Sequence, residues 1–175
     1  MEPLQGKVCQ LRLLRLSLPL IVLIGGCINP FAPGWDDTPS QASCDPHTIE
    51  GIFQCFQAAY TYRDTTAYGQ MIDQDFVFVY RNYDLGIDVT WGRDEEMRTT
   101  YGLFQNVQRL DLIWNNIVST SAESTRVNVV RGFSLTLVFN PSDIDQVAGM
   151  ANLTFERARV SDPWKIVLWR DESNY

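Results

Sequence analysis

Closely spaced carboxylates are the side chains of this sequence that could carry acid–base or metal chemistry. Asp94-Glu95-Glu96 is a consecutive acidic run, and neighbouring carboxylates can share a proton or hold a cation. Acidic residues in the first turn of a helix also interact favourably with the helix macrodipole, and we favour this simpler interpretation of the run. The spacings Asp84 to Asp88 and Asp143 to Asp145 resemble fragments of calcium loops. Without a complete ligand set they are more typical of turns.

His47 is the only histidine of the chain. A single imidazole cannot form a multi-histidine metal site, and we find no partners for an ordinary Ser–His or Cys–His nucleophile. We therefore expect no metal site and no cofactor. We interpret His47 as a solvated residue near the beginning of a helix.

Cys27 is the residue with the clearest chemical context. Lys7, Arg12 and Arg15 precede the apolar stretch 16–24, and Ile24-Gly25-Gly26-Cys27 closes it. A charged segment, a short apolar run and small residues at a cleavage site are the three parts of a secretory signal. A cysteine after two glycines is typical of a bacterial lipobox, in which the thiol carries a thioether-linked diacylglyceryl group. The alternative is a plain secretory signal in which Cys27 is incidental.

The apolar run is shorter than the about 20 residues that span a bilayer, so the lipid on Cys27 would be the membrane anchor. We expect a bacterial cell-envelope lipoprotein. Ile28, rather than Asp, follows the cysteine and indicates the outer membrane, with the domain facing the periplasm. We predict a signal peptide over residues 1–26, a lipidated and proline-rich tether over 27–45, and one domain over 46–172.

The formal net charge is −7, and cleavage before Cys27 would make the mature chain more acidic. An anionic surface without a basic cluster repels phosphate backbones, so we predict that nucleic acid is not a partner. Attraction to anionic lipid head groups is disfavoured for the same reason. The predicted partners are the membrane, through the lipid, and a small apolar ligand or a protein.

Cys44 and Cys55 remain for a disulfide in an oxidising compartment. Geometry argues against the bond. If a helix begins near His47, Cys55 lies about 12 Å along its axis, and residue 44 must fold back to come within the reach of a disulfide. Both the bonded and the free forms stay open at this point.

Helical periodicity appears in the first half of the domain. Asp45-Pro46 is a typical helix start, and apolar residues then recur at three- and four-residue spacing as far as Tyr60. This pattern predicts a helix that ends near Arg63-Asp64. Two further helices are predicted, over 66–72 and from Trp91 to about Phe104.

The second half alternates with a period of two, which is typical of strands. Residues 76–80 form a first strand and 82–88 a loop. Strands then follow from residue 110, over 126–139 with Gly132 as a candidate bulge, over 147–159 and over 164–170. The order predicts an α+β fold in which three helices pack on a curved, mostly antiparallel sheet.

This order of elements resembles the nuclear-transport-factor-2-like superfamily, the cone-shaped fold of ketosteroid isomerases, polyketide cyclases and many small binding domains. The matching residues are Ala58 to Asp64, Tyr68 with Met71 to Phe76, Trp91-Gly92-Arg93, and Asp162 to Arg170. In the isomerases an Asp at the end of the first strand takes a proton and a Tyr in the first helix donates to the oxyanion. Those positions correspond to about Tyr80 and Phe56 here, so the resemblance does not imply isomerase activity.

Six aromatic residues have the elements and parities to line the mouth of such a cone, or else to fill its core: Tyr60, Phe78, Tyr80, Trp91, Phe104 and Trp114. We expect Tyr80 and Trp91 to be largely buried and to serve the interior more than chemistry. Two functions remain open. The first is a non-catalytic domain that binds a small apolar ligand or a protein, and the second is a small acid–base enzyme that uses a pocket carboxylate, such as Asp84, with a tyrosine.

The resemblance also implies self-association, because similar domains often dimerise through the open face of the sheet. That face carries Val130, Val138, Ala148 and Met150 among polar residues, so it is only moderately apolar. We predict a weak or optional homodimer.

Overall fold

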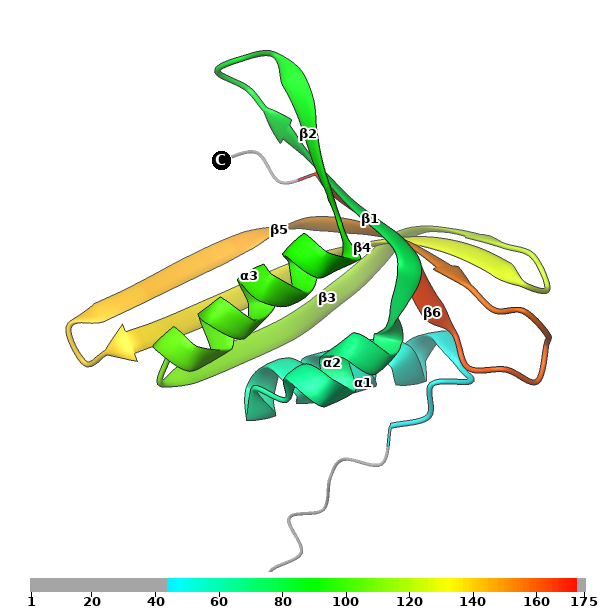
Figure 1. The fold of residues 1–175 in the computed structure, drawn as a ribbon, viewed down its shortest axis with the longest axis horizontal. Helices are drawn as coiled ribbons and strands as arrows, with labels where there is room; N and C mark the ends of the chain where they lie inside the picture. The colour runs from blue at the N-terminus through cyan, green and yellow to red at the C-terminus, as the bar shows by residue number, and fades with distance from the viewer. Residues whose placement is uncertain (1–43, 173–175) are drawn as a thin grey trace, which may run out of the picture. The chain divides into compact units, whose positions relative to one another are not determined.

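A computed structural model describes residues 44–172 (Figure 1). Its elements, in chain order, are α1 (Ile49–Tyr62), α2 (Thr65–Met71), β1 (Ile72–Asn82), β2 (Ile87–Gly92), α3 (Arg93–Asn106), β3 (Arg109–Ala122), β4 (Arg126–Asn140), β5 (Asp143–Glu156) and β6 (Lys165–Asp171). The predicted signal peptide, Cys27 and the tether up to residue 43 lie outside the described residues.

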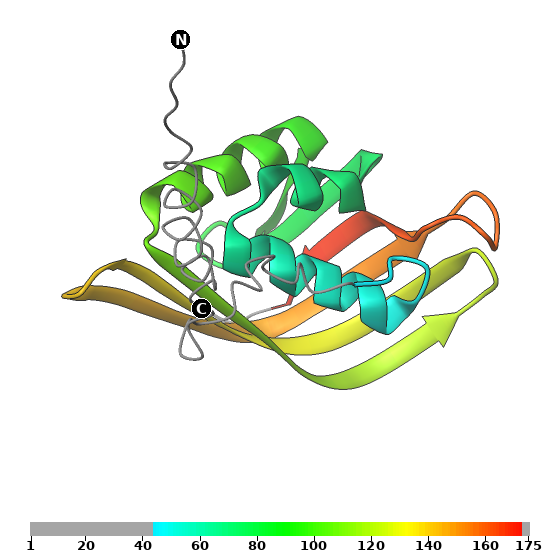
Figure 2. The same cartoon turned by 90° about the horizontal axis from the view of Figure 1, so that it is seen from below.

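The six strands form one sheet in the order β2-β1-β6-β5-β4-β3. The β1–β6 pair is parallel and the other four pairs are antiparallel. All three helices lie on one face of the curved sheet, as Figure 2 shows, with α1 against β3 and α3 against β1. The predicted α+β architecture is therefore confirmed. None of the helices between residues 44 and 172 is long and apolar enough to cross a membrane.

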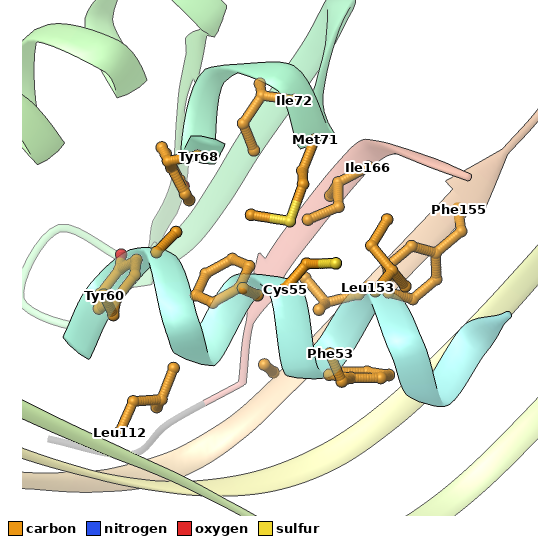
Figure 3. Close-up of a cluster of buried hydrophobic side chains, with 14 of the residues drawn as sticks. Phe53, Cys55, Tyr60, Tyr68, Met71, Ile72, Leu112, Leu153, Phe155 and Ile166 are labelled. Atoms are coloured by element: carbon orange, nitrogen blue, oxygen red, sulfur yellow. The ribbon is translucent and has the colours of Figure 1, made fainter. Parts of the chain in front are cut away.

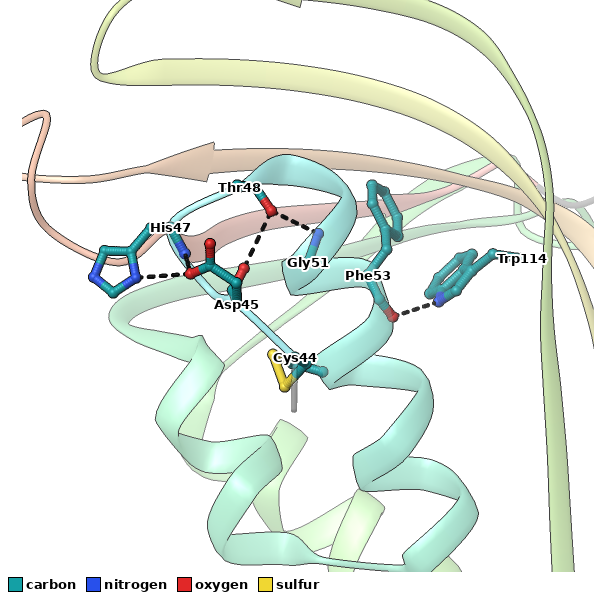
Figure 4. Close-up of a disulfide and its surroundings, with 8 residues drawn as sticks. Cys44, Asp45, His47, Thr48, Gly51, Phe53 and Trp114 are labelled. Carbon is teal, nitrogen blue, oxygen red and sulfur yellow. Dashed lines mark hydrogen bonds and ion pairs between the residues drawn. A yellow bond between two sulfur atoms is a disulfide. The ribbon is translucent and has the colours of Figure 1, made fainter. Parts of the chain in front are cut away.

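Helix α1 begins later than the sequence pattern predicts. Its N-cap is Thr48, whose hydroxyl accepts a hydrogen bond from the Gly51 amide at 3.0 Å (Figure 4). The Asp45 carboxylate instead accepts from the backbone N–H of His47, also at 3.0 Å, and closes a turn before the helix. The prediction that Asp45-Pro46 starts the helix was therefore wrong by about one turn.

A disulfide joins Cys44 to Cys55, with 5.1 Å between their Cα atoms (Figure 4). The chain before α1 folds back along the helix, which is the movement that the bond requires. Gly51 allows it, because a Cβ atom at this position would lie 1.9 Å from the carbonyl oxygen of Asp45. The sequence-based argument against the Cys44–Cys55 bond was wrong, because it did not foresee that the backbone could approach the helix so closely at Gly51.

The core lies between α1 and the middle of the sheet. Phe53, Phe56 and Tyr60 of α1 are buried in one cluster with Leu153 of β5 and Ile166 of β6. Figure 3 shows part of this cluster around α1. Full burial of a large apolar side chain stabilises a fold by about 1.5–3 kcal/mol, so this helix face is a principal source of stability. The three- and four-residue spacing of α1 is confirmed as a core-facing pattern.

Residues 87–92 differ from the prediction. They form the edge strand β2, and Trp91 lies in this strand rather than at the beginning of the third helix. Trp91 pairs in register with Phe78 of β1, and their rings stack with centroids 4.2 Å apart. The turn between the strands contains Gly86 at φ 66°, a left-handed conformation that glycine adopts readily.

The irregularity near Gly132 lies on the neighbouring strand. Asn115 and Asn116 of β3 both stand opposite Gly132, because the register runs from Trp114–Phe133 directly to Ile117–Arg131. Gly132 itself keeps regular pairing with β5. Gly132 was therefore correctly placed at a bulge, but the extra residue belongs to β3.

Candidate functional site

A pocket of about 190 Å³ opens between α1, α3 and the concave face of the sheet. For comparison, an apolar cavity of about 150 Å³ in another protein holds benzene. We call it the aromatic pocket, because seven of its lining residues carry aromatic rings: Phe56, Tyr60, Phe78, Trp91, Trp114, Phe133 and Trp169. Its polar lining residues are Glu96, Thr99, Thr100 and Asp171.

Four of the six aromatic residues singled out in the sequence, Tyr60, Phe78, Trp91 and Trp114, line this pocket. The other two lie beside it. Phe104 is buried in the core against Tyr60, with ring centroids 5.2 Å apart. Tyr80 is half-buried and packs on the ring of Trp91 at 5.6 Å.

Tyr80 and Trp91 are less buried than expected. Both are half-buried, and Trp91 forms part of the pocket wall. The expectation that both are largely buried was wrong, because Trp91 belongs to an edge strand, which has a neighbour on one side only. Both residues still pack against the core, and their serving the interior more than chemistry stays a prediction.

Glu96 is the chemically distinctive residue of the pocket. Its side chain is buried, with 5% of the residue exposed. One carboxylate oxygen, Oε1, accepts hydrogen bonds from the Tyr68 hydroxyl at 2.6 Å and from the Thr100 hydroxyl at 3.1 Å. The other oxygen, Oε2, accepts from the indole N–H of Trp91 at 2.8 Å. Three elements therefore converge on one carboxylate: α2 through Tyr68, β2 through Trp91, and α3 itself.

The helical period of α3 explains why Glu96 points inward. Glu96, Thr100 and Phe104 are spaced by four residues and are the buried positions of this helix. Asp94 and Glu95 are exposed in the first turn of α3, where acidic side chains interact favourably with the helix macrodipole. Glu95 also forms an ion pair with Arg98. All three acidic residues lie in the first turn of α3, but the macrodipole interpretation did not separate Glu96, whose position on the buried stripe distinguishes it from its neighbours.

No positive side chain among residues 44–172 forms an ion pair with Glu96. Its three donors are all neutral groups. A buried carboxylate without a cation is energetically unfavourable unless hydrogen bonds compensate it. Each hydrogen bond to a charged group contributes about 1.5–3 kcal/mol, so the three donors together can hold the carboxylate in place.

Two buried tyrosines respond to this charge. Burial raises the pKa of the Tyr60 phenol well above its usual value, and the charge of Glu96 raises it further. The pKa of Tyr68 is also raised, first by burial and then by the charges of Tyr60 and Glu96 and the hydrogen bond to Glu96. Both phenols therefore remain neutral at physiological pH, and the Tyr68 hydroxyl donates its proton to Glu96.

The indole groups of the pocket differ in their partners. Trp114 donates its N–H to the backbone carbonyl of Phe53 at 3.0 Å, which fixes the ring against α1 (Figure 4). The Trp169 N–H is buried and has no hydrogen-bond partner among the described residues.

The remaining chemical candidates lie away from the pocket. His47 is exposed and pairs with Asp45 at 2.9 Å. Asp84 is exposed in the turn between β1 and β2, so it cannot be the pocket carboxylate that we had considered. Asp143 and Asp145 are exposed. Within residues 44–172 no group of three or more His, Cys, Asp or Glu side chains is arranged to hold a metal ion.

The two positions that correspond to the isomerase pair also carry no acid–base function. Phe56 presents a hydrocarbon ring to the pocket, and Tyr80 lies outside its lining. The buried carboxylate of this pocket comes from α3 instead, a position that the comparison with isomerases does not predict.

No family model and no curated protein matches this sequence. Solved structures do match its fold. A conserved protein from Planctomyces limnophilus has 13% identity and a TM-score of 0.61, covering 70% of this chain and 90% of its own. A scytalone dehydratase-like protein from Novosphingobium aromaticivorans has 15% identity and a TM-score of 0.62, covering 73% and 82%.

A proposed dehydratase of the nuclear-transport-factor-2-like family, from Streptomyces avermitilis, has 14% identity and a TM-score of 0.56. The match covers 73% of this chain and 94% of that protein. Identities this low show the fold and leave the chemistry open. The described part of the chain therefore has the nuclear-transport-factor-2-like fold, as its sequence resemblance indicates.

Proposed function

We propose that this protein is a membrane-anchored bacterial lipoprotein whose domain binds a small, mostly apolar ligand in the aromatic pocket. The observation that carries the proposal is the pocket itself. A space of about 190 Å³ walled by aromatic rings with few polar groups is typical of a ligand site rather than of a close-packed core. By comparison with benzene in about 150 Å³, it suits a ligand of about eight non-hydrogen atoms.

Mass spectrometry of the full chain, purified from its own host under native conditions, tests this function. We expect a co-purifying molecule of about this size, which a Val147→Phe variant should lose. Val147 lines the pocket, so a larger side chain there narrows it. Val138→Phe is the matched control, because Val138 belongs to the opposite face of the sheet by strand alternation. If the Val147→Phe variant retains the molecule, the molecule binds outside the aromatic pocket.

A second candidate is a small acid–base enzyme, and the buried Glu96 beside a tyrosine favours it specifically. Two proteins of similar fold are named as dehydratases, which supports the same idea. The described pocket offers two carboxylates, Glu96 and Asp171, and Glu96 is the one that accepts a hydrogen bond from a tyrosine, whereas Tyr60 and Tyr68 remain neutral phenols. Conversion of the co-purified molecule by wild type, and not by Glu96→Gln, would favour the enzyme over the binding domain.

The anchor is tested separately. The lipobox residues support a mature chain that begins with lipid-bearing Cys27. Cys27→Ser should block cleavage and release the protein from the membrane fraction, whereas Cys9→Ser, within the signal peptide, should not. Normal processing and membrane retention of Cys27→Ser would contradict the proposal.

A further inference from the structure

We propose that the ligand of the aromatic pocket is an organic cation, a small ammonium compound whose charged nitrogen binds Glu96 while its hydrocarbon part lies among the rings. This inference rests on the proposed ligand-binding function and specifies the chemical class of the ligand.

The first argument is the charge of the pocket. Among residues 44–172, the charged residues that line it are Glu96 and Asp171, and no lysine, arginine or histidine of this range lines it. The three hydrogen-bond donors to Glu96 are neutral, so they orient the carboxylate without cancelling its charge. Inside a site of low dielectric this charge attracts a cation strongly and repels an anion.

The second argument is the unused capacity of the carboxylate. An ionised carboxylate offers about four acceptor positions, and three are occupied here. Oε1 accepts two hydrogen bonds and Oε2 accepts one, so Oε2 can still accept from a ligand. Because Glu96 lines the pocket, a ligand N–H can approach it from that side.

The third argument is the aromatic wall around this carboxylate. The face of an aromatic ring, and of tryptophan above all, attracts a cation within about 6 Å of its centroid. Trp91, Trp114 and Trp169 all line the pocket, and Trp91 also donates to Glu96. Tryptophan rings and a buried carboxylate in one pocket are the combination that recognises an ammonium group with an apolar body.

Three probes of nearly equal size separate charge from shape. Benzylammonium, benzyl alcohol and benzoate each have about eight or nine non-hydrogen atoms, which fits the pocket volume. They should be titrated against the purified full chain by calorimetry, with tryptophan fluorescence as a second readout. We expect benzylammonium to bind at least about tenfold more tightly than benzyl alcohol, and benzoate to bind most weakly of the three.

Two matched variants then locate the charge. Glu96→Gln should lower the affinity ratio of benzylammonium to benzyl alcohol toward one. Glu95→Gln removes the same charge from an adjacent, exposed residue and should leave the ratio unchanged. If Glu96→Gln does not fold, the wild-type ratio of the three probes still decides whether the pocket prefers a cation.

The outcomes separate the two proposals. Equal affinity of wild type for benzyl alcohol and benzylammonium would overturn the proposal of a cationic ligand and leave a pocket for neutral apolar ligands. An unchanged affinity ratio in Glu96→Gln would overturn the assignment of Glu96 as the group that binds the cation. If none of the three probes binds, the proposed ligand-binding function fails together with this inference.

Discussion

Removal of the Tyr68 hydroxyl tests whether the network around Glu96 stabilises the fold. Tyr68 is fully buried, and its hydroxyl donates to Glu96 at 2.6 Å. Phenylalanine keeps the ring and its edge contacts with Phe56 and Phe104, so Tyr68→Phe deletes essentially one hydrogen bond. A hydrogen bond to a charged group contributes about 1.5–3 kcal/mol, and we expect the free energy of unfolding to fall by this amount.

Thermal melts of the full chain followed by circular dichroism measure the effect. For a domain of about 130 residues, a loss of 1 kcal/mol lowers the Tm by about 3–4 °C, so we expect a fall of about 5–11 °C. Tyr62→Phe is the matched control. Tyr62 is 59% exposed, and we expect its variant to stay within about 0.5 kcal/mol of wild type.

A double-mutant cycle with Glu96→Gln attributes the loss to the pair. If the Tyr68 hydroxyl acts through the carboxylate, the two substitutions should couple by about 1 kcal/mol or more. The view that this network holds Glu96 in place would be refuted by a Tyr68→Phe variant with the same Tm as wild type, or by a double-mutant cycle with no coupling.

Three further predictions concern other parts of the domain. Replacing Cys44 and Cys55 together by serine removes a disulfide whose cysteines are separated by 11 in sequence. The free energy of unfolding, measured by denaturant titration, should fall by about 2.8 kcal/mol. A variant with the same denaturant midpoint as wild type would contradict this. Because the pKa values of Tyr60 and Tyr68 are raised above the usual 10.0, their contribution to stability is fully present below pH 10 and is lost as the pH rises further. Ultraviolet absorbance should therefore show these two phenols ionising only with alkaline unfolding, and Tyr68→Phe should remove one of them from that step. On the outer sheet face Met150 is 39% exposed among polar neighbours, so sedimentation should detect at most a weak dimer. A dimer that persists at nanomolar concentration would show that this face associates more strongly than we predict.

Periodic patterns predicted the frame of this fold well. The core face of α1 and the alternation of the long strands β4 and β5 are strong signals, because many residues repeat the same period. The edge strand β2 gave no such signal. It has six residues and only Val89 and Trp91 are half-buried, so its alternation is too short to separate from a loop.

The pocket could be predicted only in part. Aromatic residues on elements that meet in the cone were identifiable, and four of six line the pocket. Glu96 was missed because the acidic run was interpreted as a unit. A count of four and eight residues back from the buried Phe104 leads to Thr100 and Glu96, so the signal was present in the period of the helix. The disulfide was harder to predict, because it depends on a backbone approach at Gly51 that periodicity does not encode.

The placement of Glu96 has a consequence that links binding to stability. A position on the buried stripe of a helix would normally carry an apolar residue, because a buried carboxylate without a cation is unfavourable. Here Tyr68, Trp91 and Thr100 hold the carboxylate from α2, β2 and α3, so the same bonds that orient it also connect the elements around the pocket. A cation that binds Glu96 would add an attractive interaction that the unfolded chain does not make. Ligand occupancy should therefore appear as increased thermal stability, and the increase should depend on Glu96 rather than on the exposed Glu95.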